Sequence, residues 1–216
     1  KKIYLTASGG PFFYNKNILF DKVDLKQVKA HPKWKMGINN LIDSSNFMNK
    51  LLEIFELSYI YDIPLSKIDF LVSKEAFIHS LVEYQDGIYS LNSFKSDMLI
   101  TLSYPLKKYF NNLSHISSQN YLFNTKNFQI DLKVDKRFIL FKYYKKILKF
   151  NHTQQINLLL LNNIAQYLYL TGKIKYDDII PYSMKKIVKF KKNYDFKNLI
   201  DIVNYINDFN SQNTNE

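Results

Sequence analysis

The stretch IDSSNFMNKLLEIFEL, residues 42–57, decides how the first half of the chain is organised. Its apolar residues recur at helical spacing and cover most of the circumference of the helix that this spacing predicts. The polar side chains share one arc of about 120° at 100° per residue. They are Asn46, Asn49, Lys50, Glu53 and Glu56. A surface helix is mostly polar, so we expect this one to be buried on most sides and to turn its polar stripe toward a ligand or partner.

The residues on either side predict where this helix begins and ends. Asp43, Ser44 and Ser45 are favoured N-cap residues at its start. Pro64 follows shortly after Tyr61, which we expect to be close to the last helical residue.

Strands and further helices complete the expected fold. Short runs of β-branched and aromatic residues predict strands at residues 3–7, 68–72 and 77–84, and the turn residues Asp86-Gly87 predict a hairpin over 77–92. This order predicts an α+β domain with a small mixed sheet and helices over residues 1–110. A polar connector over 111–136 and a C-terminal helical bundle over 137–216 should follow. The four helices of the bundle are expected at 138–150, 154–170, 176–190 and 196–209.

The composition is that of a globular chain. Hydrophobic residues make up 46% of the 216 residues, which is enough for a real core. The sequence has no run of about 18 uncharged apolar residues, so no membrane span is predicted. The first residues also lack the pattern of a signal peptide. The chain has no cysteine, so disulfides and thiolate chemistry are excluded and a reducing compartment is expected.

The formal net charge of +11 is compatible with nucleic acid, an anionic membrane surface or a phosphorylated substrate as partner. The favoured explanation is an AT-rich genome, because AT-rich codons encode the abundant Lys, Asn, Ile, Tyr and Phe. A lysine series at 185, 186, 189, 191 and 192 has the spacing of a solvated helix face. No nucleic-acid-binding motif accompanies it, so RNA binding is the weakest hypothesis.

Polar residues in four segments are suited to a phosphate. They are Ser8 beside Gly9-Gly10, His31 in HPKWKMG (31–37), Ser44, and Asn49 with Lys50. Hydroxyl, amide, imidazole and ammonium groups hold phosphate where no P-loop is present. Glu53, one turn further along the stripe, could bind a hard divalent cation. The spacing also fits a buried hydrogen-bond network, a subunit interface or a plain Lys50–Glu53 pair.

Five motifs in a fixed order carry a family resemblance. They are LTASGGPF (5–12), HPKWKMG (31–37), IDSSNFMNKLLE (42–53), FIHSLVEYQDG (77–87) and SDM (96–98). This set resembles 1-deoxy-D-xylulose 5-phosphate reductoisomerase, and LLLLNNIAQYLYLTGKIKYDDI (158–179) is loosely similar to the family's terminal helical domain. The resemblance makes residues 1–110 the catalytic domain.

The resemblance implies a role for each matching residue. Those that hold the substrate phosphate are Ser8, His31, Ser44 and Asn49. Lys50 would contact the hydroxyl end of the substrate, and Glu53 would be one of three carboxylate ligands of Mg²⁺ or Mn²⁺. Lys50, Glu53 and His31 form the implied catalytic set. Trp34 and Met36 would lie on a flap over residues 31–37, and Gly37 would approach NADPH together with Met36.

The implied reaction is a metal- and NADPH-dependent one. The substrate 1-deoxy-D-xylulose 5-phosphate would rearrange and then be reduced to 2-C-methyl-D-erythritol 4-phosphate, in the non-mevalonate isoprenoid pathway. The resemblance also implies a homodimer, and a cytoplasmic location in a bacterium or endosymbiont or a plastid-type organelle.

Several departures from the family's pattern limit this expectation. The family's N-terminal NADPH-binding domain and the Asp-Ser-Glu segment with the other two metal ligands have no counterpart in these 216 residues. Leu51, Ala76 and Ser96 replace the family's usual Gly, Ser and Pro. We therefore expect the isolated chain to be inactive, with a decayed relative that keeps the fold and dimerises as the alternative. His79, inside a predicted strand, is expected to be a hydrogen-bonded structural histidine.

Overall fold

The computed structural model describes residues 1–30, 36–94, 103, 106, 130, 135–190 and 193–213. Most of the expected connector, the SDM motif and His31–Lys35 of the expected flap lie outside these residues. The chain divides into two compact units. The first unit contains Lys1–Ile18 and Lys26–Asp135, and the second contains Leu19–Leu25 and Lys136–Glu216.

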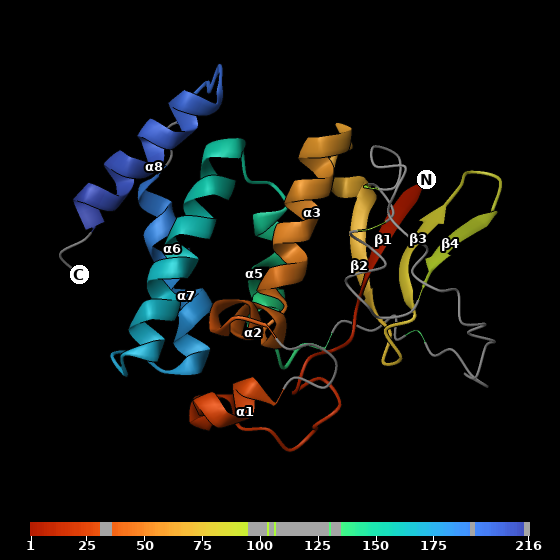
Figure 1. Cartoon of the computed structure of the whole chain (residues 1–216), viewed down its shortest axis with the longest axis horizontal. Coiled ribbons are helices and arrows are strands. Elements are labelled where there is room, and N and C mark those ends of the chain that lie inside the picture. Colours follow the sequence, from red (N-terminus) through yellow and green to blue (C-terminus); the bar gives the residue numbers. More distant parts are fainter. Residues whose placement is uncertain are drawn as a thin grey trace. The chain divides into compact units, whose positions relative to one another are not determined.

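The first unit is built on a four-stranded mixed sheet (Figure 1). Its strands are β1 (Lys2–Ala7), β2 (Ile68–Val72), β3 (Ile78–Glu83) and β4 (Tyr89–Ser93). They lie in the order β2-β1-β3-β4. The β1–β2 pair is parallel, whereas β3 is antiparallel to both β1 and β4. The sheet confirms the predicted fold class for this half of the chain.

The parallel pair depends on the long crossover that joins β1 to β2, because parallel strands cannot be joined by a tight turn. The crossover contains three α-helices, α1 (Leu25–Lys29), α2 (Ile38–Ser45) and α3 (Met48–Tyr61). Two short 3₁₀ helices, η1 (Phe20–Lys22) and η2 (Leu65–Lys67), complete it. α3 lies beside β2 in Figure 1, so the helix of the opening stretch covers the sheet of its own unit.

The single helix predicted over residues 42–57 is wrong, because the structure has two helices with a break between them. The N–H of Asn46 closes α2 on the carbonyl of Ile42, and its side-chain oxygen accepts the N–H of Met48 at 2.9 Å. Phe47 takes a left-handed backbone conformation with φ of 68°. An Asn side chain can compete in this way with the helical backbone, which the apolar spacing does not reveal.

The N-cap prediction fails for the same reason. Asp43, Ser44 and Ser45 lie in the last turn of α2, and Phe47 occupies the N-cap position of α3. Asn46 is therefore not part of the polar stripe, since its side chain is buried and accepts a hydrogen bond at the break between the helices.

Aromatic and aliphatic side chains of α3 and the sheet form the core of the first unit. The buried residues of α3 are Met48, Leu51, Ile54 and Phe55. At the break, the ring of Phe47 stacks on that of Phe70 at 5.4 Å and meets Phe13 edge-on at 5.9 Å. Because Phe47 is only 2% exposed, the packing holds its unusual backbone in place.

The Gly9-Gly10 turn after β1 makes a close backbone contact with α2. Both glycines have positive φ, 87° for Gly9 and 56° for Gly10. A Cβ on Gly10 would lie 3.0 Å from the carbonyl oxygen of Ser44. Only glycine fits this approach without strain, so the turn and the end of α2 are fixed against each other.

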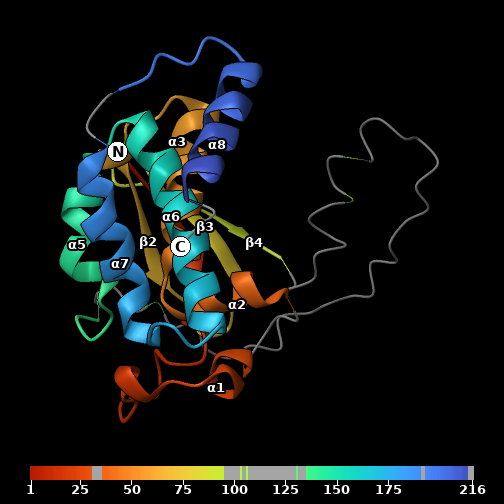
Figure 2. The ribbon, with the colours of Figure 1, turned by 90° about the vertical axis from the view of Figure 1, so that its left-hand side faces the viewer.

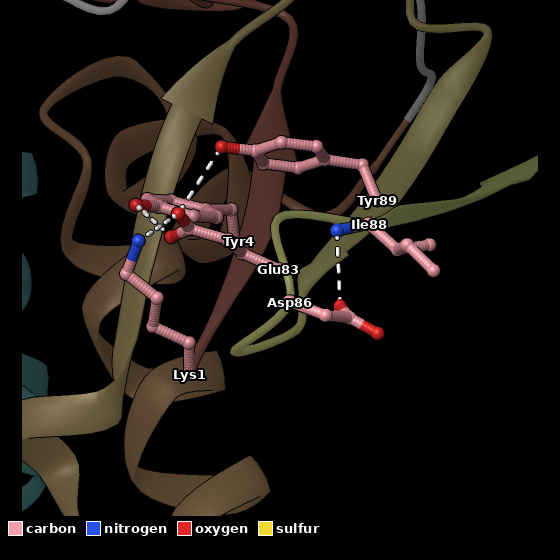
Figure 3. Close-up of polar contacts among 6 residues, drawn as sticks. All are labelled: Lys1, Tyr4, Glu83, Asp86, Ile88 and Tyr89. Carbon is pink, nitrogen blue, oxygen red and sulfur yellow. Dashed lines mark hydrogen bonds and ion pairs between the residues drawn. The ribbon is translucent and has the colours of Figure 1, made fainter.

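The hairpin of β3 and β4 forms as predicted. Gly87 has φ of 84° in its turn, and the Asp86 carboxylate accepts the N–H of Ile88 at 3.1 Å (Figure 3). Beside the turn, Glu83 accepts hydrogen bonds from Lys1 at 2.6 Å and Tyr89 at 3.1 Å. The Lys1 hydrogen bond, supported by that of Tyr89 and opposed by burial, lowers the pKa of the Glu83 carboxyl.

The second unit is helical, as predicted (Figure 2). Its helices are α5 (Leu140–Ile147), α6 (His152–Leu170), η3 (Tyr176–Asp178), α7 (Ile179–Lys186), η4 (Ile187–Lys189) and α8 (Leu199–Asn213). A capping box of Asn151 and Gln154 starts α6, which ends just before Gly172 at φ of 74°. α6 packs along α7, and the Tyr205 hydroxyl of α8 donates to the buried Asn157 of α6 at 2.9 Å.

A short early segment, Leu19–Leu25, is also part of the second unit. The ring of Phe20 contacts Phe138 at 5.1 Å and stacks on Tyr176 at 6.1 Å. The Tyr169 hydroxyl donates to the carbonyl of Val23 at 3.3 Å. In the described part of the chain, no helix has the length and apolar character needed to cross a membrane.

We predict that Gly10→Ala destabilises the protein by about 3 kcal/mol or more, because it adds left-handed strain to a contact with the Ser44 carbonyl. Gly87→Ala is the matched control, since Gly87 also has positive φ but open space around its Cβ position. It should cost only about 1 kcal/mol. Urea unfolding of both variants measures the difference, and equal losses would contradict the close contact.

We predict that Glu83→Gln lowers stability at neutral pH, because the Lys1–Glu83 ion pair is lost. The pKa of Glu83 is lower in the folded chain, so its carboxylate stabilises the fold above pH 4.5, the ordinary value, and loses that effect as the pH falls through the folded value. The difference between the two proteins should therefore shrink as the pH falls below 4.5 in a series of urea titrations. Glu56→Gln, at an exposed position, should change little over the same series.

Candidate functional site

The first unit contains a cavity of about 490 Å³. It lies where the carboxyl ends of the parallel strands β1 and β2 meet the Gly9-Gly10 turn. The remaining walls come from one face of α2, the start of α3 and the beginning of the β3–β4 hairpin. Crevices at the carboxyl ends of parallel strands are common ligand sites in α/β sheets.

The polar stripe of α3 forms one wall of this cavity. Asn49, Lys50 and Glu53 all line it. The Lys50 ammonium lies 2.7 Å from one oxygen of Glu53, and the Asn49 amide donates to the other oxygen at 2.6 Å. The two contacts fix the carboxylate, and Lys50 keeps only 14% of its side chain exposed. Glu56, the last member of the predicted stripe, is exposed and does not line the cavity.

Two serines on separate elements also line the cavity. Ser8 follows β1 directly, beside the glycine turn, and Ser44 comes from the last turn of α2. The contact between Gly10 and the Ser44 carbonyl joins the two segments. The structure thus brings Ser8 together with Ser44 and the Asn49-Lys50 pair, which lie at least 36 residues later in the sequence.

The expected cofactor and flap residues are only partly described. Met36 lines the cavity. Gly37 is exposed, serves as N-cap of α2 and has φ of −61°, which any residue can adopt. Nothing described lies within 4 Å of a Cβ built on it, so neither packing nor backbone in the described residues requires a glycine. His31 and Trp34 lie outside the described residues.

His79 lines the cavity, although the sequence suggested only a structural histidine. The expected hydrogen bond is present, since its Nε2 lies 3.0 Å from the carbonyl of Phe94. The ring also stacks on that of Phe94 at 3.7 Å. Burial lowers the pKa of His79, and the nearby Lys50 charge lowers it further against the Phe94 hydrogen bond. The imidazole is therefore neutral at pH 7.

Thr6 and Asn40 are further polar cavity residues that sequence reasoning missed, and Asn40 is the one on α2. It lies four residues after Met36 and four before Ser44 on α2. Asn40 and Ser44 therefore lie one turn apart on the same side of α2, which is the signal that could have found Asn40.

The described residues do not form a complete metal site. Glu53 is the only carboxylate on the cavity wall, and within the described part of the chain no three His, Cys, Asp or Glu side chains gather as around a metal ion. Hard divalent cations need several oxygen ligands. Glu53 can therefore supply one ligand at most.

Comparison with known proteins gives the same family throughout. A family model described as the 1-deoxy-D-xylulose 5-phosphate reductoisomerase C-terminal domain matches residues 1–61. The 1-deoxy-D-xylulose 5-phosphate reductoisomerase of Sulfurihydrogenibium sp. is 36% identical over 210 residues, which cover 96% of this chain and 55% of that protein.

Solved structures agree with the fold. A reductoisomerase in complex with NADPH, fosmidomycin and magnesium matches 99% of this chain and 54% of its own, with a TM-score of 0.80 and 26% identity. The Zymomonas mobilis enzyme in complex with NADPH matches 96% of this chain and 53% of its own, also with a TM-score of 0.80 and 26% identity.

These matches extend over nearly the whole of this chain, which spans about half the length of the curated relatives. They include both the mixed sheet with its helices and the helices that follow it. The chain therefore belongs to the 1-deoxy-D-xylulose 5-phosphate reductoisomerase family and corresponds to the catalytic and C-terminal region of its members.

Proposed function

We propose that this chain forms the substrate-holding part of a 1-deoxy-D-xylulose 5-phosphate reductoisomerase. The observation that carries the proposal is the convergence of Ser8, Ser44, Asn49, Lys50 and Glu53 on one cavity. These residues come from three separate elements, and a purely structural hydrogen-bond network would not need an open cavity between them.

The phosphate would lie between the glycine turn and the end of α2. Ser8 and Ser44 offer hydroxyl donors there, and Asn49 offers an amide. Lys50, paired with Glu53, would contact the hydroxyl end of the substrate beside this phosphate. Hydrogen bonds to a charged acceptor are stronger than neutral ones, so a few such donors suffice without a P-loop.

Glu53 would face the hydroxyl end of the sugar phosphate. Lys50 and Asn49 already hold its two oxygens in one orientation. This arrangement positions the carboxylate before any ligand binds, which reduces the cost of ordering the site.

NADPH and Mg²⁺ or Mn²⁺ are the cofactors we propose for the complete protein, because a relative is described in complex with NADPH and magnesium. Glu53 alone does not fit a divalent cation, so no metal-dependent step is assigned to the described residues. We infer that residues 1–216 alone are inactive and that other ligands and the nicotinamide site complete the enzyme. His31 and Trp34, with Met36 and Gly37, would form the flap that excludes water from the closed site.

A decayed relative without catalysis is the second candidate. Ala76, at a position where many family members carry Ser, lines the cavity with an apolar methyl group and has φ of 51°. The loss of one hydroxyl at this wall is the feature that favours decay. The cytoplasmic or plastid-type location stays a prediction for both candidates.

We also propose that the protein is a homodimer that pairs through β4. This strand is at the edge of the sheet, and all five of its residues are exposed. Tyr89 and Leu91 add apolar side chains that are 52% and 50% exposed. An exposed edge strand readily pairs with another strand, and a second copy of β4 satisfies both edges at once around a twofold axis.

We predict that Lys50→Ala weakens binding of 1-deoxy-D-xylulose 5-phosphate to the complete protein by about tenfold to a hundredfold, because a charge-assisted contact worth about 1.5–3 kcal/mol is lost. Isothermal titration calorimetry measures the change. Lys67→Ala is the control, since Lys67 is an exposed lysine of the same unit away from the cavity. A decayed site would bind the sugar phosphate weakly and respond equally to both substitutions.

We predict that Leu91→Lys shifts the protein from dimer to monomer, because like charges would face each other across the paired edges. Sedimentation at several concentrations measures the shift. Leu159→Lys adds the same charge at an exposed apolar position of α6, where Leu159 is 41% exposed, and should leave the mass unchanged. A wild-type protein that is monomeric throughout would contradict the proposed interface.

A further inference from the structure

Asn40 is an exposed polar residue on the wall of the cavity, in the first turn of α2. No motif discussed above includes it. In the described part of the chain, its amide makes no hydrogen bond and no ion pair. Its two donors and its acceptor are thus available to whatever fills the cavity.

The position of Asn40 relative to Ser44 suggests what it contacts. Both residues line the same cavity from the same helix, one turn apart. Side chains at this spacing have Cβ atoms about 5–6 Å apart. A phosphoryl group has three strong acceptor oxygens, so one such group can accept hydrogen bonds from both side chains.

The charges near Asn40, in the first turn of this helix, favour an anion. The first turn of α2 carries no acidic residue. Among the described residues of the cavity wall, Glu53 is the one carboxylate, and it is paired with Lys50. The amino end of a helix also carries a partial positive charge, which adds to the effect of the Asn40 donors.

We propose that Asn40 is a further binding residue of this site and that its amide donates to the same phosphoryl group as Ser44. The inference rests on the proposed function, because it assumes that a sugar phosphate occupies the cavity. It deepens that function by adding a hydrogen-bond donor from the first turn of α2, close in sequence to the flap residue Met36.

Asn40→Asp provides the sharpest test. The substitution keeps the shape of the side chain, removes both donors and brings a negative charge beside the phosphoryl group. An acidic residue in the first turn of a helix favours the helix, so the variant should fold. We expect binding of 1-deoxy-D-xylulose 5-phosphate to the complete protein to weaken more than tenfold, and about fivefold to tenfold for Asn40→Ala.

Asn39→Asp is the matched control. Asn39 is the preceding residue of the same helical turn, it is exposed, and it does not line the cavity. The same change of charge there should alter the dissociation constant less than twofold. Circular dichroism and thermal unfolding of all the variants verify that each is folded.

The titrations separate failure of this inference from failure of the proposed function. If Lys50→Ala weakens binding while Asn40→Asp and Asn39→Asp behave alike, the role of Asn40 is overturned and the proposed function stands. If Asn40→Asp weakens binding of NADPH but not of the sugar phosphate, the role of Asn40 is overturned as well. If the wild-type protein binds neither 1-deoxy-D-xylulose 5-phosphate nor inorganic phosphate, both fall together.

Discussion

The hydrogen bond from the Met48 N–H to the Asn46 side chain is the interaction on which the site depends. The N–H of Asn46 closes α2, its side chain accepts the N–H of the first residue of α3, and the chain changes direction at Phe47. A left-handed conformation at a residue other than glycine costs about 1–3 kcal/mol. The stacking of Phe47 on Phe70 and its burial in the core offset that cost. Without the break, Ser44 and Lys50 would belong to one continuous helix and could not form two walls of one cavity.

Much of the fold follows from local patterns in the sequence. The strands and the hairpin were predicted because β-branched runs end at strong turn residues, and Asp86-Gly87 forms the turn that its chemistry favours. The helix break was not predicted, since apolar residues keep their helical spacing through Asn46 and Phe47. The place of Leu19–Leu25 in the second unit was also unpredictable, because it depends on contacts with residues such as Tyr169 that are distant in sequence.

The candidate site also has a part that the sequence predicts and a part that it does not. Asn49, Lys50 and Glu53 could be found because they share one helical face, and the structure places all three on the cavity wall. His79 was assigned a structural role, since a strand pattern shows the alternation of side chains but not which face meets a ligand. Asn40 was missed because it lies between the motifs at 31–37 and 42–53 and belongs to neither. The family motifs located the serines more reliably than any spacing could.

The path of the chain between its two units affects how the protein can fold. Leu19–Leu25 belongs to the second unit, while the residues on either side of it belong to the first. The hydrogen bond from Tyr169 to Val23 closes a loop of 146 residues. Such closure carries a large entropic cost and tends to slow folding. During synthesis Leu19–Leu25 emerges long before its packing partners, so the second unit cannot be completed until the helices after residue 136 have left the ribosome.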